Sequence, residues 1–203
     1  GKISTGANEL QVTNSGVTAM VGYSSFNYVI GNLRKTVTGT GTYLFPLGST
    51  THYELLQITL NSTSGFATLL GKFTKANPIN PSYPLTGVFV SETSIDSMLN
   101  YGYWTLTPNS AITAGSYSFK ASERGYSNTI SSVYYYPLLI RTNINSSWQT
   151  NGNDQAFKYT SGTLTSNKTG ITMFGDLAIG FGQCPPIFGF DNYTLISGTN
   201  NQP

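Results

Sequence analysis

The residues best suited to chemistry in this sequence are few and lie far apart. His52 is the only histidine, and Tyr53 and Glu54 follow it directly. A catalytic triad needs a base that an acid orients, and the sequence has no GxSxG elbow that would present a nucleophile. We therefore interpret His52 as a surface or turn residue and assign no catalytic residue.

Two carboxylates at helical spacing, Glu92 and Asp96, could serve a glycan hydrolase. Such enzymes hold two carboxyl groups ~5 to 9.5 Å apart, and a helix over residues 91–100 would bring this pair together. In a chain with 8 acidic residues among 203, such spacing also arises by chance. We treat hydrolysis as the least favoured of three functions.

Metal binding has one candidate segment, residues 151–154, whose Asn151, Asn153 and Asp154 could offer oxygens to calcium. An Asx-rich turn explains the same residues, and we favour it. Cys184 is the only cysteine, so neither an intramolecular disulfide nor a multi-cysteine metal site can form. We predict no cofactor and no metal.

Aromatic residues are more informative, because the chain holds 14 Tyr and 2 Trp. Consecutive tyrosines at 134–136 must place side chains on both faces of a strand. Exposed rings could stack on sugars or pack against a neighbouring subunit, although we favour the simpler explanation that the tyrosines lie flat on a sheet with hydrated hydroxyls. The candidate contact residues are Tyr134, Tyr136, Tyr83 and Tyr193.

Charge and hydropathy exclude several classes of partner. Charged residues make up only 9% of the chain, and its 10 basic residues are scattered, so phosphate neutralisation by a basic stripe is not expected. No apolar run approaches the ~20 residues that span a bilayer, and the first residues lack a signal-peptide pattern. We expect a soluble domain that binds neither nucleic acid nor membrane.

The elements that must position these residues centre on residues 28–60. Val29, Leu33 and Val37 alternate with polar residues, and Gly31 and Lys35 share their inner phase, which indicates a half-buried strand. A turn at 38–41 and the segment Phe45-Pro46-Leu47-Gly48 follow. Because proline lacks a backbone donor, we expect this segment to leave its sheet at a bulge or edge and redirect the chain.

Alternation elsewhere predicts an all-β fold. The pattern favours an antiparallel β-sandwich of about ten to twelve strands with at most one short helix, at residues 91–100. Pro137 implies a bulge or an edge in the most apolar run, residues 133–142. Trp104 should lie beneath Phe45 and Leu56, with Tyr103 and Thr105 facing outward. We predict one sandwich domain over residues 1–182 and a tail or linker over residues 183–203.

Six segments occur together in an order typical of one family: GKISTGANELQVTNSG, YVIGNLRKTV, FPLGSTTHYELLQITL, YWTL, LLIRTNINSSWQT and GITMFGDLAIG. In this order they resemble modules of large secreted surface proteins of gliding and biofilm-forming Bacteroidota, over roughly residues 1–182. The resemblance implies a β-sandwich, export by the type IX secretion system, and a role in adhesion or surface fibres. It transfers no catalytic residue.

The leading functional hypothesis is thus a non-enzymatic module of a secreted, cell-surface or extracellular fibre protein. A carbohydrate-binding module is the alternative. Expected partners are neighbouring modules or subunits of the same protein, with surface glycans as a further candidate. Asp96-Ser97-Met98 resembles an O-glycosylation acceptor of Bacteroidota, and N-glycosylation sequons begin at Asn61, Asn145, Asn167 and Asn192.

The tail contains an apolar segment, residues 188–196, whose flanks are too polar for it to hold a core of its own. It could dock on its own domain or add to a sheet edge of a neighbouring subunit. We favour docking on the same chain, because ordered terminal extensions are mostly tied down locally.

Overall fold

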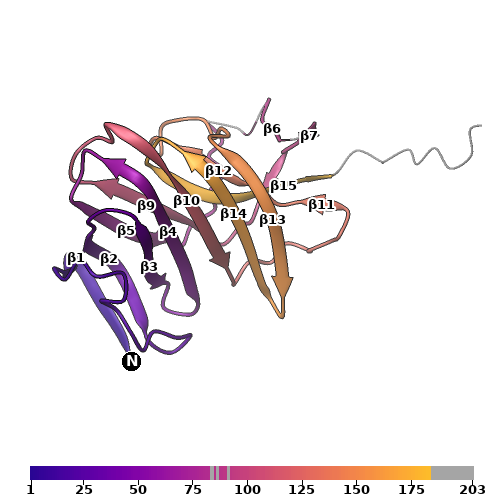
Figure 1. Cartoon of the computed structure of the whole chain (residues 1–203). Helices are drawn as coiled ribbons and strands as arrows, with labels where there is room; N and C mark the ends of the chain where they lie inside the picture. Colours follow the sequence, from indigo (N-terminus) through magenta and orange to yellow (C-terminus); the bar gives the residue numbers. More distant parts are fainter. Residues whose placement is uncertain (83–84, 86, 91, 184–203) are drawn as a thin grey trace, which may run out of the picture.

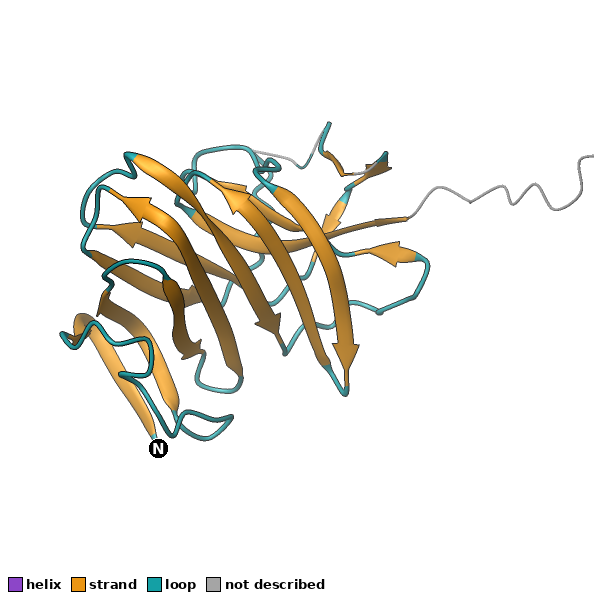
Figure 2. Ribbon diagram, in the orientation of Figure 1, coloured by secondary structure: helices purple, strands orange, loops and turns teal. Residues whose placement is uncertain are grey.

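The structure, a computed structural model, describes residues 1–82, 85, 87–90 and 92–183. Within them the chain is all-β, without helix (Figures 1 and 2). Its fifteen strands are β1 (Lys2–Val12), β2 (Tyr28–Thr36), β3 (Gly41–Gly48), β4 (Tyr53–Ser64), β5 (Thr68–Thr74), β6 (Phe89–Val90), β7 (Thr93–Ser94), β8 (Ser97–Met98), β9 (Tyr103–Pro108), β10 (Ala114–Glu123), β11 (Tyr134–Tyr135), β12 (Leu138–Arg141), β13 (Asn153–Thr160), β14 (Thr163–Ile171) and β15 (Asp176–Gln183).

Thirteen of these strands form one sheet that curls into two facing layers (Figure 1). The first layer has the order β3-β4-β10-β14-β13, and the second has β5-β9-β15 with β12 added to β15. The result is a sandwich-like half-barrel, so the predicted all-β class is confirmed. The pairings are not all antiparallel, since β1 pairs with β2 and β2 with β3 in parallel.

Strand β2 joins the two layers because it pairs with both. Val29 and Ile30 pair with β3, whereas the second half of the strand, from Leu33 to Thr36, pairs with β5. Gly31, at a φ of 109°, lies between the two halves. Backbone of this kind suits glycine, and strands that pass between packed sheets commonly bend at such points.

A buried lysine in β2 links this strand to β3 at the place where the two layers join. Lys35 is fully buried, as its phase in the sequence predicted, and its Nζ donates to the Leu44 carbonyl at 3.1 Å. Burial lowers the pKa of this lysine, because desolvation disfavours the ammonium form. A polar link therefore joins β2 to β3 inside the core.

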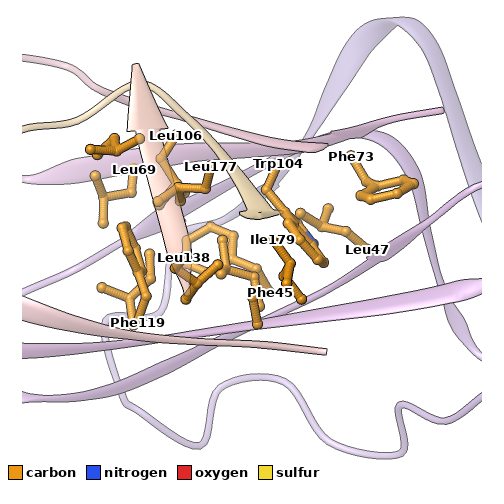
Figure 3. Packing of buried hydrophobic residues seen from close by; sticks show 14 of the residues in the cluster. Phe45, Leu47, Leu69, Phe73, Trp104, Leu106, Phe119, Leu138, Leu177 and Ile179 are labelled. Atoms are coloured by element: carbon orange, nitrogen blue, oxygen red, sulfur yellow. The ribbon is translucent and has the colours of Figure 1, made fainter. Parts of the chain in front are cut away.

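The core fills the space between the layers with the inward phase of each strand (Figure 3). In β4 and β10 the inward residues include Leu56, Ile58 and Phe119, and in β9 they are Trp104 and Leu106. Trp104 is fully buried, as predicted, and its Nε1 donates to the Glu54 carbonyl at 3.2 Å, across from the first layer. Figure 3 shows it near Phe45 in the packed cluster.

A second cluster lies on the outer face of β9, β12 and β15. The predicted outward position of Tyr103 is correct, but the residue is only 7% exposed, because it packs in a cluster with described residues of the segment between β5 and β9. The cluster consists of Val88, Val90, Ile95, Met98, Tyr103, Leu139, Trp148 and Ala178.

The helix expected at residues 91–100 is wrong for the described residues 92–100. Two short strands, β7 and β8, take its place. Ile95 donates its N–H to Val88 and Leu99 donates to Ile179, so the backbone groups are satisfied by distant partners. Tertiary hydrogen bonding thus overrides a weak local helix pattern.

The Phe-Pro-Leu-Gly segment also differs from its prediction. Strand β3 continues through Pro46, which faces Leu55 of β4, and the chain turns only after Gly48. Proline is tolerated because the parallel partner β2 pairs only with Leu47 and Gly48 of β3. At Pro137 no bulge forms: it lies between β11 and β12, which both pair with β15 in one continuous register, and its carbonyl accepts from the Gly180 N–H.

We predict that Gly71→Ala destabilises the protein by about 1–3 kcal/mol through overpacking. A Cβ at Gly71 of β5 would lie 2.5 Å from Cδ1 of Phe45, which is fully buried on the facing layer. Urea denaturation measures the effect. In a Phe45→Leu background, Gly71→Ala should lower the free energy of unfolding by less. An equal loss in both backgrounds would contradict the proposed contact.

Candidate functional site

A groove on the outer face of the second layer is the best-formed candidate site. It has a volume of about 500 Å³, within the range typical of ligand sites. We call it the β5–β9 groove. Its lining combines amide, hydroxyl and charged groups with apolar side chains, namely Asn32, Leu70, Lys72, Thr74, Tyr103, Thr105, Leu106, Thr107, Pro108, Thr142, Asn143, Ile144, Phe174, Gly175 and Asp176.

Strand register places the polar groups of this groove in one row. Lys72 of β5 lies opposite Thr105 of β9, and Thr105 lies opposite Asp176 of β15. Directly opposed residues on neighbouring strands have Cβ atoms about 4.5–5.5 Å apart. The row therefore presents an ammonium, a hydroxyl and a carboxylate across three strands.

The carboxylate in this row is held by a buried ion pair. Arg141 Nε lies 2.9 Å from Asp176 Oδ2, and both side chains are nearly inaccessible. Thr105 Oγ1 donates to the other oxygen, Oδ1, at 2.7 Å. Asp176 thus has both oxygens engaged, so it is a rigid acceptor in the groove rather than a free base.

The arginine of this pair also fixes the second cluster. Its guanidinium lies 4.3 Å from the Trp148 ring centroid and 5.2 Å from that of Tyr103. Arg141 and Trp148 both donate to the Pro78 carbonyl, at 3.4 and 3.2 Å. Cation–π contacts are strongest when desolvated, so this cluster anchors the covering segment beside the groove.

The predicted contact tyrosines do not gather in the groove. Tyr136 is 1% exposed, and its hydroxyl bonds to Ser131, so its predicted role as an exposed ring is wrong. Its ring packs on Phe157 in the core, because alternation gives it the same phase as Leu138 and Ile140, which also face the core. Tyr134 is half-buried against Phe181. Tyr83 and Tyr193 lie outside the described residues.

His52 belongs to a hydroxyl network in the loop after β3. Its Nδ1 lies 3.0 Å from the Tyr101 hydroxyl, which also bonds to Ser49 and Thr51 at 2.6 Å each. Within the described chain no carboxylate bonds to this histidine. The geometry supports the turn interpretation, because Ser49 Oγ accepts from the His52 N–H and closes the loop.

Glu92 and Asp96 lose the helix that would have paired them. Both are exposed, and Glu92 has a φ of 65° in the turn between β6 and β7. Neither contributes to the β5–β9 groove. Their spacing of four residues therefore does not place them on one face as predicted.

The calcium candidate at 151–154 has its oxygens engaged by the fold. Asp154 Oδ2 lies 2.6 Å from Lys168 Nζ, and Oδ1 accepts from the Leu138 N–H at 3.3 Å. Asn151 Oδ1 accepts from Thr172 N–H at 2.9 Å. Among the described residues no group of three or more His, Cys, Asp or Glu side chains could hold a metal.

The remaining sequence candidates divide between strands and undescribed residues. Asn61 and Asn167 lie in β4 and β14, Asn145 lies in an exposed loop, and Ser97 of the acceptor motif pairs with Phe181. Asn192, Cys184 and the apolar tail segment lie outside the described residues.

Sequence reasoning missed two buried carboxyl groups, Glu54 and Glu123. Both are fully buried at the ends of β4 and β10, where Arg124 N–H donates to Glu54 Oε2 at 2.7 Å. Oε1 of Glu54 forms no hydrogen bond in the described structure, and neither oxygen of Glu123 forms one of normal geometry, although the Gly102 N–H lies close to that carboxyl group. The signal was present, since Glu54 shares the inward phase of Leu56 and Ile58.

Burial raises the pKa of both carboxyl groups. For Glu54 desolvation is the main cause, the proximity of Glu123 adds to it, and the Arg124 amide and charge oppose it. The pKa of Glu123 is well above its usual range, again through burial, with the Gly102 N–H opposing. At neutral pH both groups are therefore protonated in the folded state.

We predict that wild-type stability falls as pH rises above about 4, because the unfolded glutamates ionise near pH ~4.3 while the folded ones keep their protons. Each group contributes a slope of about 1.4 kcal/mol per pH unit until its folded pKa is reached. Glu123→Gln should remove one such contribution and stabilise the protein at pH 7 by about 3–4 kcal/mol. Urea denaturation across the pH range measures this, with Asp96→Asn as the exposed control. Parallel curves for wild type and Glu123→Gln would contradict it.

Comparison with protein-family models finds no match, and comparisons with curated proteins and with solved structures find none either. In the described part of the chain no helix has the length and hydropathy to cross a membrane. The functional argument therefore depends on the residues and their geometry.

Proposed function

We propose that the chain is a non-enzymatic adhesive module of a secreted, bacterial cell-surface or extracellular fibre protein. One observation carries the proposal. The two carboxylates that line surface hollows, Asp176 and Asp154, are both committed to buried ion pairs. General acid–base catalysis needs a group free to exchange a proton with substrate, whereas adhesion needs rigid donors and acceptors.

The framework supports this role through its surface chemistry. The hollows on both layers combine apolar surface with hydroxyl, amide and ammonium groups, and many of these groups lie on strands, which hold them in fixed positions. Such groups hydrogen-bond to polymer hydroxyls without reacting with them. Neighbouring modules of the same protein and surface glycans are the partners that this proposal implies.

We predict that beads coated with the protein adhere under flow to surfaces bearing bacterial or plant polysaccharides, and that the protein releases no reducing sugar from them. Beads coated with a heat-unfolded sample are the control, because adhesion by the folded sheet should be lost. Release of reducing ends that Glu92→Gln or Asp96→Asn abolishes would support the hydrolase hypothesis instead. Absence of adhesion to every surface would contradict the proposal.

A second candidate function, recognition of a carbohydrate, is favoured by the β5–β9 groove. Its polar row of Lys72, Thr105 and Asp176 faces the apolar side chain of Ile144, which is 52% exposed. Sugars present hydroxyls at the ring edge and apolar C–H faces, so a groove with both kinds of surface suits a neutral oligosaccharide.

We predict that Ile144→Ala weakens oligosaccharide binding by about fivefold, because the apolar contact with the sugar face is lost. Glycan-array screening followed by calorimetry measures the effect. Ile3→Ala is a matched control, since Ile3 is 51% exposed and lies in β1, outside the groove. Equal binding by both variants would argue against the groove.

A further inference from the structure

A second hollow lies on the outer face of the first layer and differs in charge from the β5–β9 groove. Its volume is about 520 Å³. We call it the basic face, because three cations and no carboxylate line it. Its residues, contributed largely by β4, β10, β14 and β13, are Leu55, Gln57, Lys120, Ser122, Arg124, Lys158, Thr160, Thr163, Thr165 and Asn167.

Register fixes where the three cations of the basic face stand. Lys158 of β13 pairs with Thr165 of β14, which pairs with Ser122 of β10. Lys120 and Arg124 lie two residues before and after Ser122, or ~7 Å away along the strand, and Lys158 lies two strands away, or ~10 Å. The cations thus surround a hydroxyl pair, Ser122 and Thr165, whose oxygens are 2.8 Å apart.

The acidic residues of these strands face the other way. Glu54, Glu123 and Asp154 all have buried side chains on the inner side of the layer. The ion pairs found in the described residues are Arg34–Glu9, Arg141–Asp176 and Lys168–Asp154. None involves a cation of the basic face, so its positive charge is not neutralised by a neighbouring carboxylate there.

Arg124 is held in position on this face. Its Nη1 donates to the Tyr53 carbonyl at 2.7 Å, and its guanidinium lies 5.2 Å from the Tyr53 ring centroid. A guanidinium has five N–H donors, and within the described chain only this one forms a hydrogen bond. The others are available to an anionic group at the surface.

We propose that the basic face binds an anionic polysaccharide, one that carries carboxylate or sulfate groups. Complementary charge supplies the attraction, and the hydroxyl and amide groups between the cations hydrogen-bond to sugar hydroxyls. Single-stranded nucleic acid fits less well, because its binding depends on aromatic stacking platforms and no aromatic side chain lines this face. Three cations are also few for neutralising a duplex.

This inference deepens the proposed adhesive function and depends on it, because it names the class of polymer that the module would hold. It concerns a face separate from the β5–β9 groove, and the two share no lining residue. Carbohydrate recognition by the β5–β9 groove and polyanion binding by the basic face can therefore be tested and contradicted independently.

The test measures calorimetric binding of the full chain to alginate oligosaccharides, dextran sulfate, neutral dextran and an oligothymidylate. The double variant Lys120→Gln/Lys158→Gln removes two cations from the basic face. Lys2→Gln/Lys75→Gln removes the same charge from exposed lysines elsewhere. Circular dichroism checks that each variant is folded.

We expect wild type to bind alginate or dextran sulfate but not dextran, and to bind less tightly as sodium chloride is raised. Lys120→Gln/Lys158→Gln should weaken binding about tenfold, and Lys2→Gln/Lys75→Gln less than about twofold. The tighter of the two polymers identifies carboxylate or sulfate as the recognised group.

Equal losses in the two double variants, or no binding to either polyanion, would overturn the inference. Tighter binding of oligothymidylate than of both polysaccharides would overturn it in favour of nucleic acid. If beads still adhere to neutral polysaccharide surfaces in those cases, the adhesive function stands. If adhesion fails on every surface, the proposed function fails as well.

Discussion

The structure depends on one strand belonging to two layers. Strand β2 pairs with β3 in its first half and with β5 in its second, and it bends at Gly31 between them. This bend brings Phe45 of the first layer against Gly71 of the second, with no room for a side chain at the glycine. Close packing across the layers requires both features, because interiors tolerate neither voids nor excess volume.

The way β2 joins the two layers decides which faces of the sheet remain available to a partner. Since the layers face each other through their inward residues, each outer face must be covered or left to solvent. Part of the second layer is covered by Ile79, Leu85, Val88, Val90, Ile95 and Trp148, and Arg141 and Trp148 both donate to the Pro78 carbonyl. Among the described residues no such segment covers the first layer, and the basic face on it is open to solvent.

Charge inside the fold is handled in two different ways. Arg141–Asp176 and Lys168–Asp154 are paired at 2.9 and 2.6 Å, and each joins segments distant in sequence. Buried pairs are costly to desolvate, and what they add is a defined geometry when each partner is satisfied. Glu54 and Glu123 have no such cations in contact and remain neutral through raised pKa values. The chain has few charged residues, and many of them are buried in the interior.

Alternation in the sequence was enough to determine the all-β class and the inward phase of Leu33, Lys35 and Trp104, because side-chain direction in a strand is a local property. Residues 93–94 and 97–98 form short strands in place of the expected helix, because tertiary hydrogen bonds outweighed a weak local preference. Tyr136 shares the phase of Leu138 and Ile140, and only the tertiary structure decided that this phase faces the core. Only the tertiary structure grouped Lys120, Arg124 and Lys158, since register between β10, β14 and β13 sets their neighbours. Register depends on the whole sheet, and no local pattern encodes it.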